Sequence, residues 1–423
     1  MAEVRNFRDY RNNKKISEEI DDDLVDEMAD DSFLYVDESD DEPSYQEKIR
    51  NHKLLVFYRT ILTMIVAAAI VVVVYINWKE KIYTEARELS SISLTGMDGV
   101  SVYSLGSCIL RVSKDGANCI GADGSAKWDQ SFEMQQPIVR ICNETVAIGD
   151  KNGNIIYVSN LGGSKGKINT NLPIKEFCVS SQGVVSVILK DGNVTRINIY
   201  DSKGTELATI KATMANSGYP VSMSLSPNGQ LLGISYLGEK SGQVGTKVTF
   251  FNFGDVGQNK TDNMVSSFNY DKSVIPVEQF LNSDTNFAVA DDRILFFKGA
   301  EVPKNPITNL LPNKEILSVF HSNNYVGLVC AGNSEKGAYE FLVYNSSGKL
   351  VLTHYFDMAY TNIVFSDDQF TIYNSEEWVL CGLDGTQRYK GRFDNTVLSI
   401  IPGPSRSRFT VVTAADLKQI ELR

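Results

Sequence analysis

Histidine is scarce in this chain of 423 residues, which contains only His52, His321 and His354. Because His52 precedes a long apolar run, a metal centre or catalytic triad built on histidine has at most two members to draw on. His321 and His354 fall within one expected repeat. We expect both to be ordinary strand or turn residues, and a shared ligand site is the alternative.

Closely spaced cysteines are also missing. The six cysteines are Cys108, Cys119, Cys142, Cys178, Cys330 and Cys381, and no two are closer than eleven positions. This spacing excludes the C-x-x-C pattern of redox and zinc sites. Each cysteine lies among apolar neighbours, so we expect small buried strand residues. A disulfide between Cys108 and Cys119 is the alternative, because an exported domain can be oxidised.

Catalytic fingerprints are absent as well. No G-x-S-x-G, H-E-x-x-H, P-loop or dinucleotide-binding pattern stands at a strand-to-helix junction. We therefore predict no catalytic residues, no cofactor-binding residues and no metal ligands, and we expect a protein that is not an enzyme.

Only residues 1–17 carry a surplus of positive charge. Residues 18–42 contain fourteen Asp or Glu and no Lys or Arg, whereas residues 43–423 carry equal numbers of both signs. The net charge of −11 is thus a property of the tail and not of a folded surface. No face remains basic enough for nucleic acid, so we predict no such partner.

What the sequence does contain is one long apolar segment, residues 54–76. At about 1.5 Å per residue a helix of this length crosses the roughly 30 Å core of a bilayer. Tyr58, Tyr75 and Trp78 lie where aromatic residues gather at membrane interfaces. A buried core helix and a cleaved signal peptide are the alternatives, and both fit less well. We predict an integral membrane protein with a single transmembrane helix.

The flanking residues predict the orientation and the remaining segments. Lys and Arg are slightly more frequent on the N-terminal side of the apolar segment, which places the N-terminus in the cytoplasm and the C-terminal domain outside the cell membrane.

The composition of residues 1–53 predicts an acidic, mostly disordered tail. Apolar residues every fourth position from Ile16 to Met28, followed by Phe33–Val36, favour a docking segment for a basic cytoplasmic partner; a merely solvated tail is the alternative. Residues 77–89 have helix-forming composition and predict a juxtamembrane helix or stalk.

From residue 90 to 423 the pattern is all-β. Short runs rich in Val, Ile, Phe, Tyr and Thr alternate with turn residues, and seven turn glycines recur at spacings of 39, 41, 53, 42, 49 and 37 residues. These markers are Gly124, Gly163, Gly204, Gly257, Gly299, Gly348 and Gly385. A period near 40 is typical of four-stranded propeller blades, so we predict a β-propeller.

The ends of the domain predict the number of blades. Three strands within residues 397–423 lack a fourth, and one strand at residues 90–96 lacks a blade. Pairing them completes an eighth blade and closes the ring, which removes exposed sheet edges. We predict eight blades, with seven as the alternative.

Several segments carry a family resemblance. Residues 221–236 (VSMSLSPNGQLLGISY) resemble the inner hairpin of WD40 repeats, and residues 122–128 (ADGSAKW) resemble the docking turn of quinoprotein repeats. Quinoprotein enzymes need adjacent cysteines and tryptophan stacking surfaces, and only Trp128 and Trp378 lie in this domain. That resemblance implies scaffold and no cofactor. The whole layout resembles a clostridial-type family of single-pass membrane proteins of unknown function with an extracytoplasmic propeller.

These observations favour a binding or scaffolding module of the cell envelope, with a protein partner at the propeller loops and a cytoplasmic partner at the tail. The alternative is an envelope enzyme, a polysaccharide lyase or hydrolase, with its site at the propeller axis. Such an enzyme predicts carboxylates and histidine at the mouth of the central channel. Signalling across the membrane is a third hypothesis.

Overall fold

The structure is a computed structural model that describes residues 45–192, 194–214, 217–240, 242–333 and 335–423. The chain divides into two compact units, Met1–Tyr75 and Ile76–Arg423. The acidic stretch 18–42 and its predicted docking segment lie outside the described residues.

The first described element is helix α1 (Tyr45–Lys79). It contains one stretch, His52–Lys79, that is long and apolar enough to cross a membrane by its length and composition. The span contains the predicted segment 54–76, beginning two residues before it and ending three residues after it.

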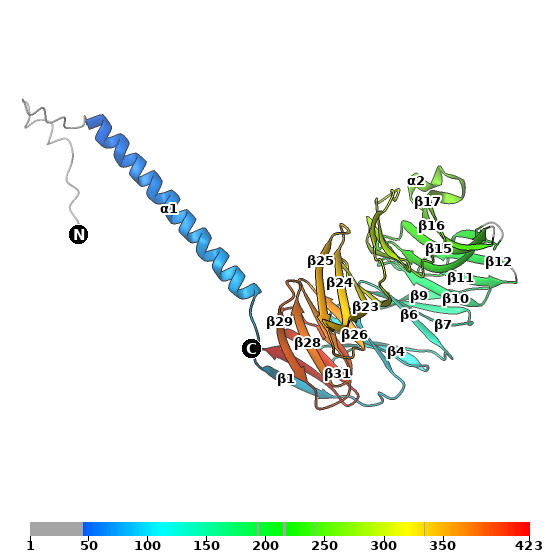
Figure 1. Cartoon of the computed structure of the whole chain (residues 1–423). Helices are drawn as coiled ribbons and strands as arrows, with labels where there is room; N and C mark the ends of the chain where they lie inside the picture. Colours follow the sequence, from blue (N-terminus) through cyan, green and yellow to red (C-terminus); the bar gives the residue numbers. More distant parts are fainter. Residues whose placement is uncertain (1–44, 193, 215–216, 241, 334) are drawn as a thin grey trace, which may run out of the picture. The chain divides into compact units, whose positions relative to one another are not determined.

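The strands of the described chain form eight four-stranded antiparallel sheets, which are the blades of a propeller (Figure 1). Blade 1 contains β2 (Ser101–Leu105), β3 (Cys108–Val112), β4 (Gly116–Gly121) and β5 (Ala126–Ser131); blade 2 contains β6 (Pro137–Cys142), β7 (Thr145–Asp150), β8 (Ile155–Asn160) and β9 (Gly163–Asn169). Blade 3 contains β10 (Ile174–Val179), β11 (Val185–Asp191), β12 (Val194–Tyr200) and β13 (Glu206–Ala212); blade 4 contains β14 (Tyr219–Leu225), β15 (Leu231–Lys240), β16 (Gln243–Asn252) and β17 (Met264–Asp271).

The second half of the ring repeats this plan. Blade 5 contains β18 (Val277–Asn282), β19 (Thr285–Val289), β20 (Arg293–Lys298) and β21 (Ile307–Leu310); blade 6 contains β22 (Ile316–His321), β23 (Tyr325–Asn333), β24 (Gly337–Asn345) and β25 (Leu350–Phe356). Blade 7 contains β26 (Asn362–Ser366), β27 (Gln369–Tyr373), β28 (Glu377–Gly382) and β29 (Gln387–Arg392); blade 8 contains β30 (Val397–Pro402), β31 (Arg408–Thr413), β32 (Asp416–Leu422) and β1 (Ala86–Ser93). The first strand of each of blades 1 to 7, and β30 of blade 8, lies next to the axis.

Blade 8 closes the ring with strands from both ends of the domain. β1 pairs antiparallel with β32, from Ala86 opposite Leu422 to Ser93 opposite Asp416. The predictions of eight blades and of this closure are confirmed. Within residues 77–89, predicted as a juxtamembrane helix or stalk, α1 continues to Lys79 and β1 begins at Ala86. Pairing with an open sheet edge outweighed the helix propensity of this segment.

The core consists of eight apolar clusters, one between each pair of neighbouring blades. Because both faces of a blade are covered, central strands such as β19 and β27 are buried at every position. Between blades 7 and 8 the indole of Trp378 packs against Phe409 and Tyr389, with ring centroids 5.1 and 5.0 Å away. Neighbouring blades thus bury their apolar side chains against each other.

The marker glycines have a physical role in the turns. Six of the seven adopt positive φ, and Gly124 (φ +76°) is an example whose added Cβ would lie 2.9 Å from Ile92. The exception is Gly257, which lies in the short helix α2 (Asp255–Gln258). This helix and the 3₁₀ turn η1 (Thr261–Asn263) are inserted between β16 and β17. The ten-residue strands β15 and β16, which both lie between Gly204 and Gly257, explain most of the long 53-residue spacing.

Candidate functional site

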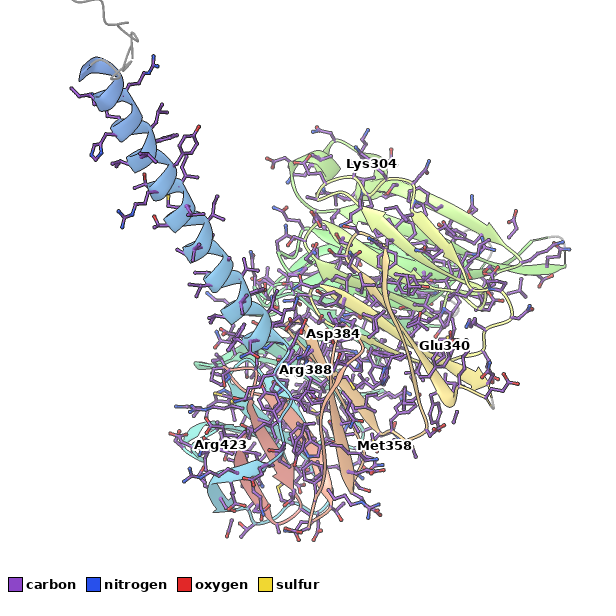
Figure 2. All side chains as sticks on the ribbon, turned by 60° about the vertical axis from the view of Figure 1, so that its left-hand side comes forward. Lys304, Glu340, Met358, Asp384, Arg388 and Arg423 are labelled. Atoms are coloured by element: carbon purple, nitrogen blue, oxygen red, sulfur yellow. The ribbon has the colours of Figure 1, made fainter. Side chains whose placement is uncertain are left out.

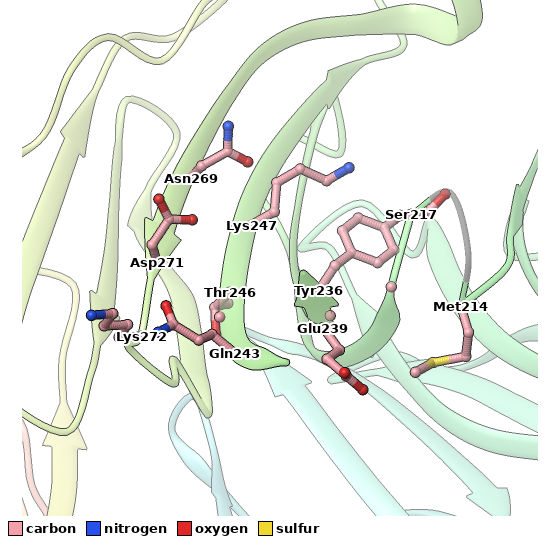
Figure 3. A pocket seen from close by; sticks show the side chains of 13 residues that line it. Met214, Ser217, Tyr236, Glu239, Gln243, Thr246, Lys247, Asn269, Asp271 and Lys272 are labelled. Carbon is pink, nitrogen blue, oxygen red and sulfur yellow. The ribbon is translucent and has the colours of Figure 1, made fainter. Parts of the chain in front are cut away.

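A broad concave surface of the propeller lies on blade 4, away from the axis. This blade 4 groove has a volume of about 450 Å³, and its polar lining includes Tyr236, Glu239, Gln243, Lys247, Asp271 and Lys272 (Figure 3). β15 and β16 have ten residues each and are the longest strands of the described chain. The groove therefore forms where a long hairpin stands beside shorter strands.

Two glycines allow neighbouring backbone segments of the groove to lie close together. At Gly218 φ is +87°, and an added Cβ would lie 2.6 Å from the Leu237 carbonyl oxygen. An added Cβ at Gly245 would lie 2.9 Å from the Tyr270 carbonyl oxygen. Larger residues at either position would push the strands apart. The shape of the groove is therefore encoded locally.

Charges of both signs surround one aromatic ring in the groove. The Nζ atom of Lys247 lies 5.8 Å from the ring centroid of Tyr236, within the range of a cation–π contact. Burial raises the pKa of Tyr236, so the phenol stays neutral. Glu239 and Asp271 face the same groove as Lys247 and Lys272 (Figure 3). Such a surface suits polar contacts with a partner more than the enclosure of an apolar molecule.

Two neighbouring depressions extend this surface. One shares Tyr236 and Lys247 with the groove and reaches Ile210 on β13, and the other shares Met214 and Gly218 and reaches Lys190 at the end of β11. The concave surface therefore continues along the junction of blades 3 and 4. An elongated partner segment would fit it better than a small molecule.

The axis holds a much smaller cavity of about 120 Å³. Side chains from the inner strands of blades 2 to 6 line it, among them Arg140, Cys142, Cys178, Gln279 and His321. Arg140 forms an ion pair with Glu176, with Nη2 and Oε1 2.9 Å apart. At one end Asn323 Nδ2 donates to Asn143 Oδ1 over 3.4 Å, and since blades 2 and 6 stand opposite in the ring, this bond crosses the axis.

The two propeller histidines lie in the same blade but on different strands. His321 ends the inner strand β22, packs against Phe287 at 5.6 Å between ring centroids, and has its pKa lowered to about 4 by burial. His354 lies on the outer strand β25, and its Nε2 atom is 3.9 Å from Cys381 Sγ. In the part of the chain that the structure describes, no three His, Cys, Asp or Glu residues gather as metal ligands.

All six cysteines are free thiols, and five of them are buried. The prediction of small buried strand residues is confirmed for these five, and Cys142 is half-buried. Cys108 and Cys119 lie on paired strands but not opposite each other, since Cys108 faces Gly121 and Cys119 faces Leu110. Burial and the neighbouring Cys108 thiol raise the pKa of Cys119 to about 12. This pair forms no disulfide in the structure.

Sequence reasoning missed the blade 4 groove and two fully buried charged side chains, Glu278 and Arg388. The available signal for the groove was the 53-residue marker spacing, which reflects the long blade. No local signal distinguishes Glu278 or Arg388 from surface residues. The Ser224 partner of Glu278 is 54 residues away, and although Asp384 lies only four residues from Arg388, the Tyr83 segment that covers Arg388 comes from the other end of the domain.

Glu278 lies on β18 at the junction of blades 4 and 5, where it is only 1% exposed. Its Oε1 atom accepts hydrogen bonds from Ser224 Oγ (2.9 Å) and Asn286 Nδ2. Burial raises the pKa of Glu278 to about 8, and these two hydrogen bonds offset only part of that rise. The carboxyl group is therefore mostly protonated at neutral pH.

Comparison with known proteins places the propeller in a family. The solved structure of BamB from Moraxella catarrhalis has 13% sequence identity and a TM-score of 0.46, and it matches over 80% of this chain and 100% of its own. The structure of apo AztD from Citrobacter koseri has 11% identity and a TM-score of 0.49, over 70% of this chain and 86% of its own. No curated protein matches significantly. The family described as "Family of unknown function (DUF5711)" matches residues 79–422, and the chain therefore belongs to this family.

Proposed function

We propose that this protein is a non-catalytic binding module of the cell envelope, anchored by a single transmembrane helix, whose propeller binds another protein through the blade 4 groove. The N-terminus lies in the cytoplasm and the propeller lies outside it, and the acidic tail binds a basic cytoplasmic partner. The apolar span His52–Lys79 supports the anchor, and the slight excess of cations on its N-terminal side supports the orientation. The acidic block at residues 18–42 supports a basic partner.

One observation carries the binding function. The blade 4 groove is open, elongated and lined by charges of both signs around Tyr236. Interfaces between proteins combine aromatic anchors with a polar, charged rim in this way. Lys247 and Asp271 would select a partner with complementary charges.

Site-specific photo-crosslinking in intact cells tests the groove. A photoreactive residue at Gln243, in the hairpin turn of blade 4, is expected to capture one discrete partner protein. The same residue at Lys114, which occupies the equivalent turn of blade 1, is the matched control. Lys247→Glu is expected to abolish the product at Gln243. Equal products at both positions, or a product indifferent to Lys247→Glu, would contradict a binding role for the groove.

The orientation has its own test. Gln243→Cys introduces an exposed thiol into a chain whose native thiols are mostly buried. A membrane-impermeant maleimide is expected to label this variant in intact cells and to leave the wild type unlabelled. Labelling that appears only after permeabilisation would place the propeller in the cytoplasm.

The alternative function is an envelope lyase or hydrolase with its site at the axis. The position of the His321 imidazole in the axial cavity favours it, and its pKa of about 4, which makes it a weak proton acceptor at neutral pH, counts against it. The cavity of about 120 Å³ is smaller than the roughly 300 to 1,000 Å³ of most ligand sites. Loss of an envelope-polysaccharide cleavage activity in His321→Ala would support this alternative over the binding module.

A further inference from the structure

Arg388 lies at the junction of blades 7 and 8, where it is one of the largest fully buried side chains of the described residues. Its Nη2 atom donates to Asp384 Oδ2 over 2.6 Å. Figure 2 labels both residues. Its Nε and Nη1 atoms are buried without any hydrogen-bond partner. A guanidinium stays charged at all relevant pH values. Burying its N–H groups without a hydrogen bond therefore destabilises the fold unless an acceptor binds them.

The unpartnered polar atoms around Arg388 are not scattered. Gln369 Nε2 and Oε1, Thr371 Oγ1 and Arg406 Nε are also buried without partners. Together with Arg388 they account for six of the twelve such atoms among the described residues. Isolated orphan atoms occur in many proteins, but a cluster of mostly donors at one junction points to a shared acceptor.

Strand pairing brings these side chains to one face of blade 7. Gln369 on β27 pairs directly with Gly382 on β28, and directly paired residues project to the same side of a sheet. An added Cβ at Gly382 would lie 2.6 Å from Arg388 Nη2 and 2.7 Å from its Nε. The guanidinium therefore lies over Gly382, next to Gln369, and Thr371 projects from the same face two residues along β27.

The segment that enters the propeller from α1 covers this face. Tyr83 is buried in the cluster between blades 7 and 8, and its backbone nitrogen donates to the Arg388 carbonyl oxygen over 2.8 Å. Burial raises the pKa of Tyr83, and the positive charges of Arg406 and Arg388 partly offset this rise. Both guanidinium groups thus act on the same phenol.

Arg406 extends the cluster to the end of α1. It pairs with Asp368, donates from Nη2 to the Lys79 carbonyl oxygen over 3.1 Å, and lies 5.0 Å from the ring centroid of Trp78. Lys79 Nζ lies 3.7 Å from Asp368 Oδ2. The cluster therefore contains three cations and the two carboxylates of Asp368 and Asp384, and the adjacent Glu80 and Lys81 cancel each other.

We propose that Arg388, Gln369 and Thr371 bind a small inorganic anion, chloride or phosphate, between blades 7 and 8 beneath Tyr83. A monovalent anion would neutralise the excess positive charge and accept hydrogen bonds from Arg388 Nε and Nη1, Gln369 Nε2 and Thr371 Oγ1. It would join the closing segment of the ring to both blades. This site is separate from the blade 4 groove and does not depend on the function proposed for it.

Chloride-35 NMR on the purified full chain in detergent tests the proposal. Bound chloride is expected to broaden the signal beyond that of detergent alone, and inorganic phosphate is expected to compete if the site accepts both anions. Thr371→Val keeps the shape of the side chain and removes one donor, so it should weaken chloride binding by about tenfold or more. Arg388→Gln should abolish the excess broadening.

Two variants provide matched controls. Thr249→Val changes a buried threonine of blade 4, and Arg293→Gln changes a half-buried arginine of blade 5 that pairs with Asp292. Both should retain the broadening of the wild type. If Arg388→Gln fails to fold, Thr371→Val and Gln369→Leu decide the question. Broadening that is absent in the wild type, or that is the same in Thr371→Val and Thr249→Val, would overturn the anion site.

Discussion

Two junctions of this propeller each bury one ionisable side chain completely, and they handle its charge in opposite ways. Glu278 between blades 4 and 5 keeps its proton, because burial raises its pKa to about 8 and no cation pairs with it among the described residues. Arg388 between blades 7 and 8 stays charged and pairs with Asp384. A carboxyl can lose its charge on burial, whereas a guanidinium needs compensating anions.

The largest effect on the free energy of unfolding should come from raising the pH until Glu278 loses its proton. The folded-state pKa of about 8 lies above the ordinary 4.5, so the folded protein binds more protons between these values and its stability falls as pH rises from 4.5 to 8. The loss is at most about 5 kcal/mol. Urea unfolding at pH 5 and pH 8.5 measures it.

Glu278→Gln cannot ionise and keeps the acceptor oxygen for Ser224 and Asn286. Its stability should resemble that of the wild type at pH 5 and exceed it at pH 8.5. Glu335→Gln, at an exposed position, should keep the wild-type pH profile. Parallel pH profiles for the wild type and Glu278→Gln would show that Glu278 is charged in the folded protein.

A smaller effect should follow from removing the compensation of Arg388. Asp384→Asn keeps the side-chain shape and the acceptor for the Thr386 backbone but leaves the buried guanidinium unpaired. We expect a loss of about 2 kcal/mol, less than for a fully buried pair, because Asp384 is 38% exposed. Asp292→Asn, in a more exposed pair with Arg293, should cost less than about 1 kcal/mol. Equal losses in urea unfolding would remove the distinction between the two pairs.

The smallest effects should come from the two glycines that make room for these side chains. Gly233→Ala would bring a Cβ to 2.0 Å from Glu278 Oε1, and Gly382→Ala would bring one to 2.6 Å from Arg388 Nη2. Each should destabilise the fold by about 1 to 2 kcal/mol through overpacking. Only Gly382→Ala should also reduce chloride broadening. The same reduction in Gly233→Ala would indicate a general loss of structure.

The sequence predicted the architecture well because blade formation is a local and repeated event. Six of the seven marker turns required a glycine that tolerates positive φ, and the apolar runs matched the central strands, which are covered on both faces. Residues 221–236 predicted an inner hairpin, and the structure places β14, a turn and β15 there. The eighth blade could be predicted because the last three strands form a complete four-stranded blade only with the strand at the start of the domain.

The candidate sites could not be predicted in this way. The segment that forms β29, QRYKGR, reads as an ordinary exposed strand, and nothing in it indicates that Arg388 is buried. The blade 4 groove depends on how far β15 and β16 extend beside their neighbours. The clustering of His321 with Arg140 at the axis depends on five blades converging there.

The sequence by itself determined the apolar span, the acidic tail and the repeat period, because each depends on composition or on residues close together in the chain. It also indicated the closure of the ring, because the strands left over at the two ends of the domain add up to one blade. Only the tertiary structure decided which ionisable side chains are neutral, which are paired with an opposite charge, and which have donor atoms without a hydrogen-bond partner. The oxygens and nitrogens that surround Glu278 come from strands up to 54 residues away, and the segment that covers Arg388 comes from the opposite end of the propeller chain. Burial depends on these distant neighbours, and burial sets the cost of a charge.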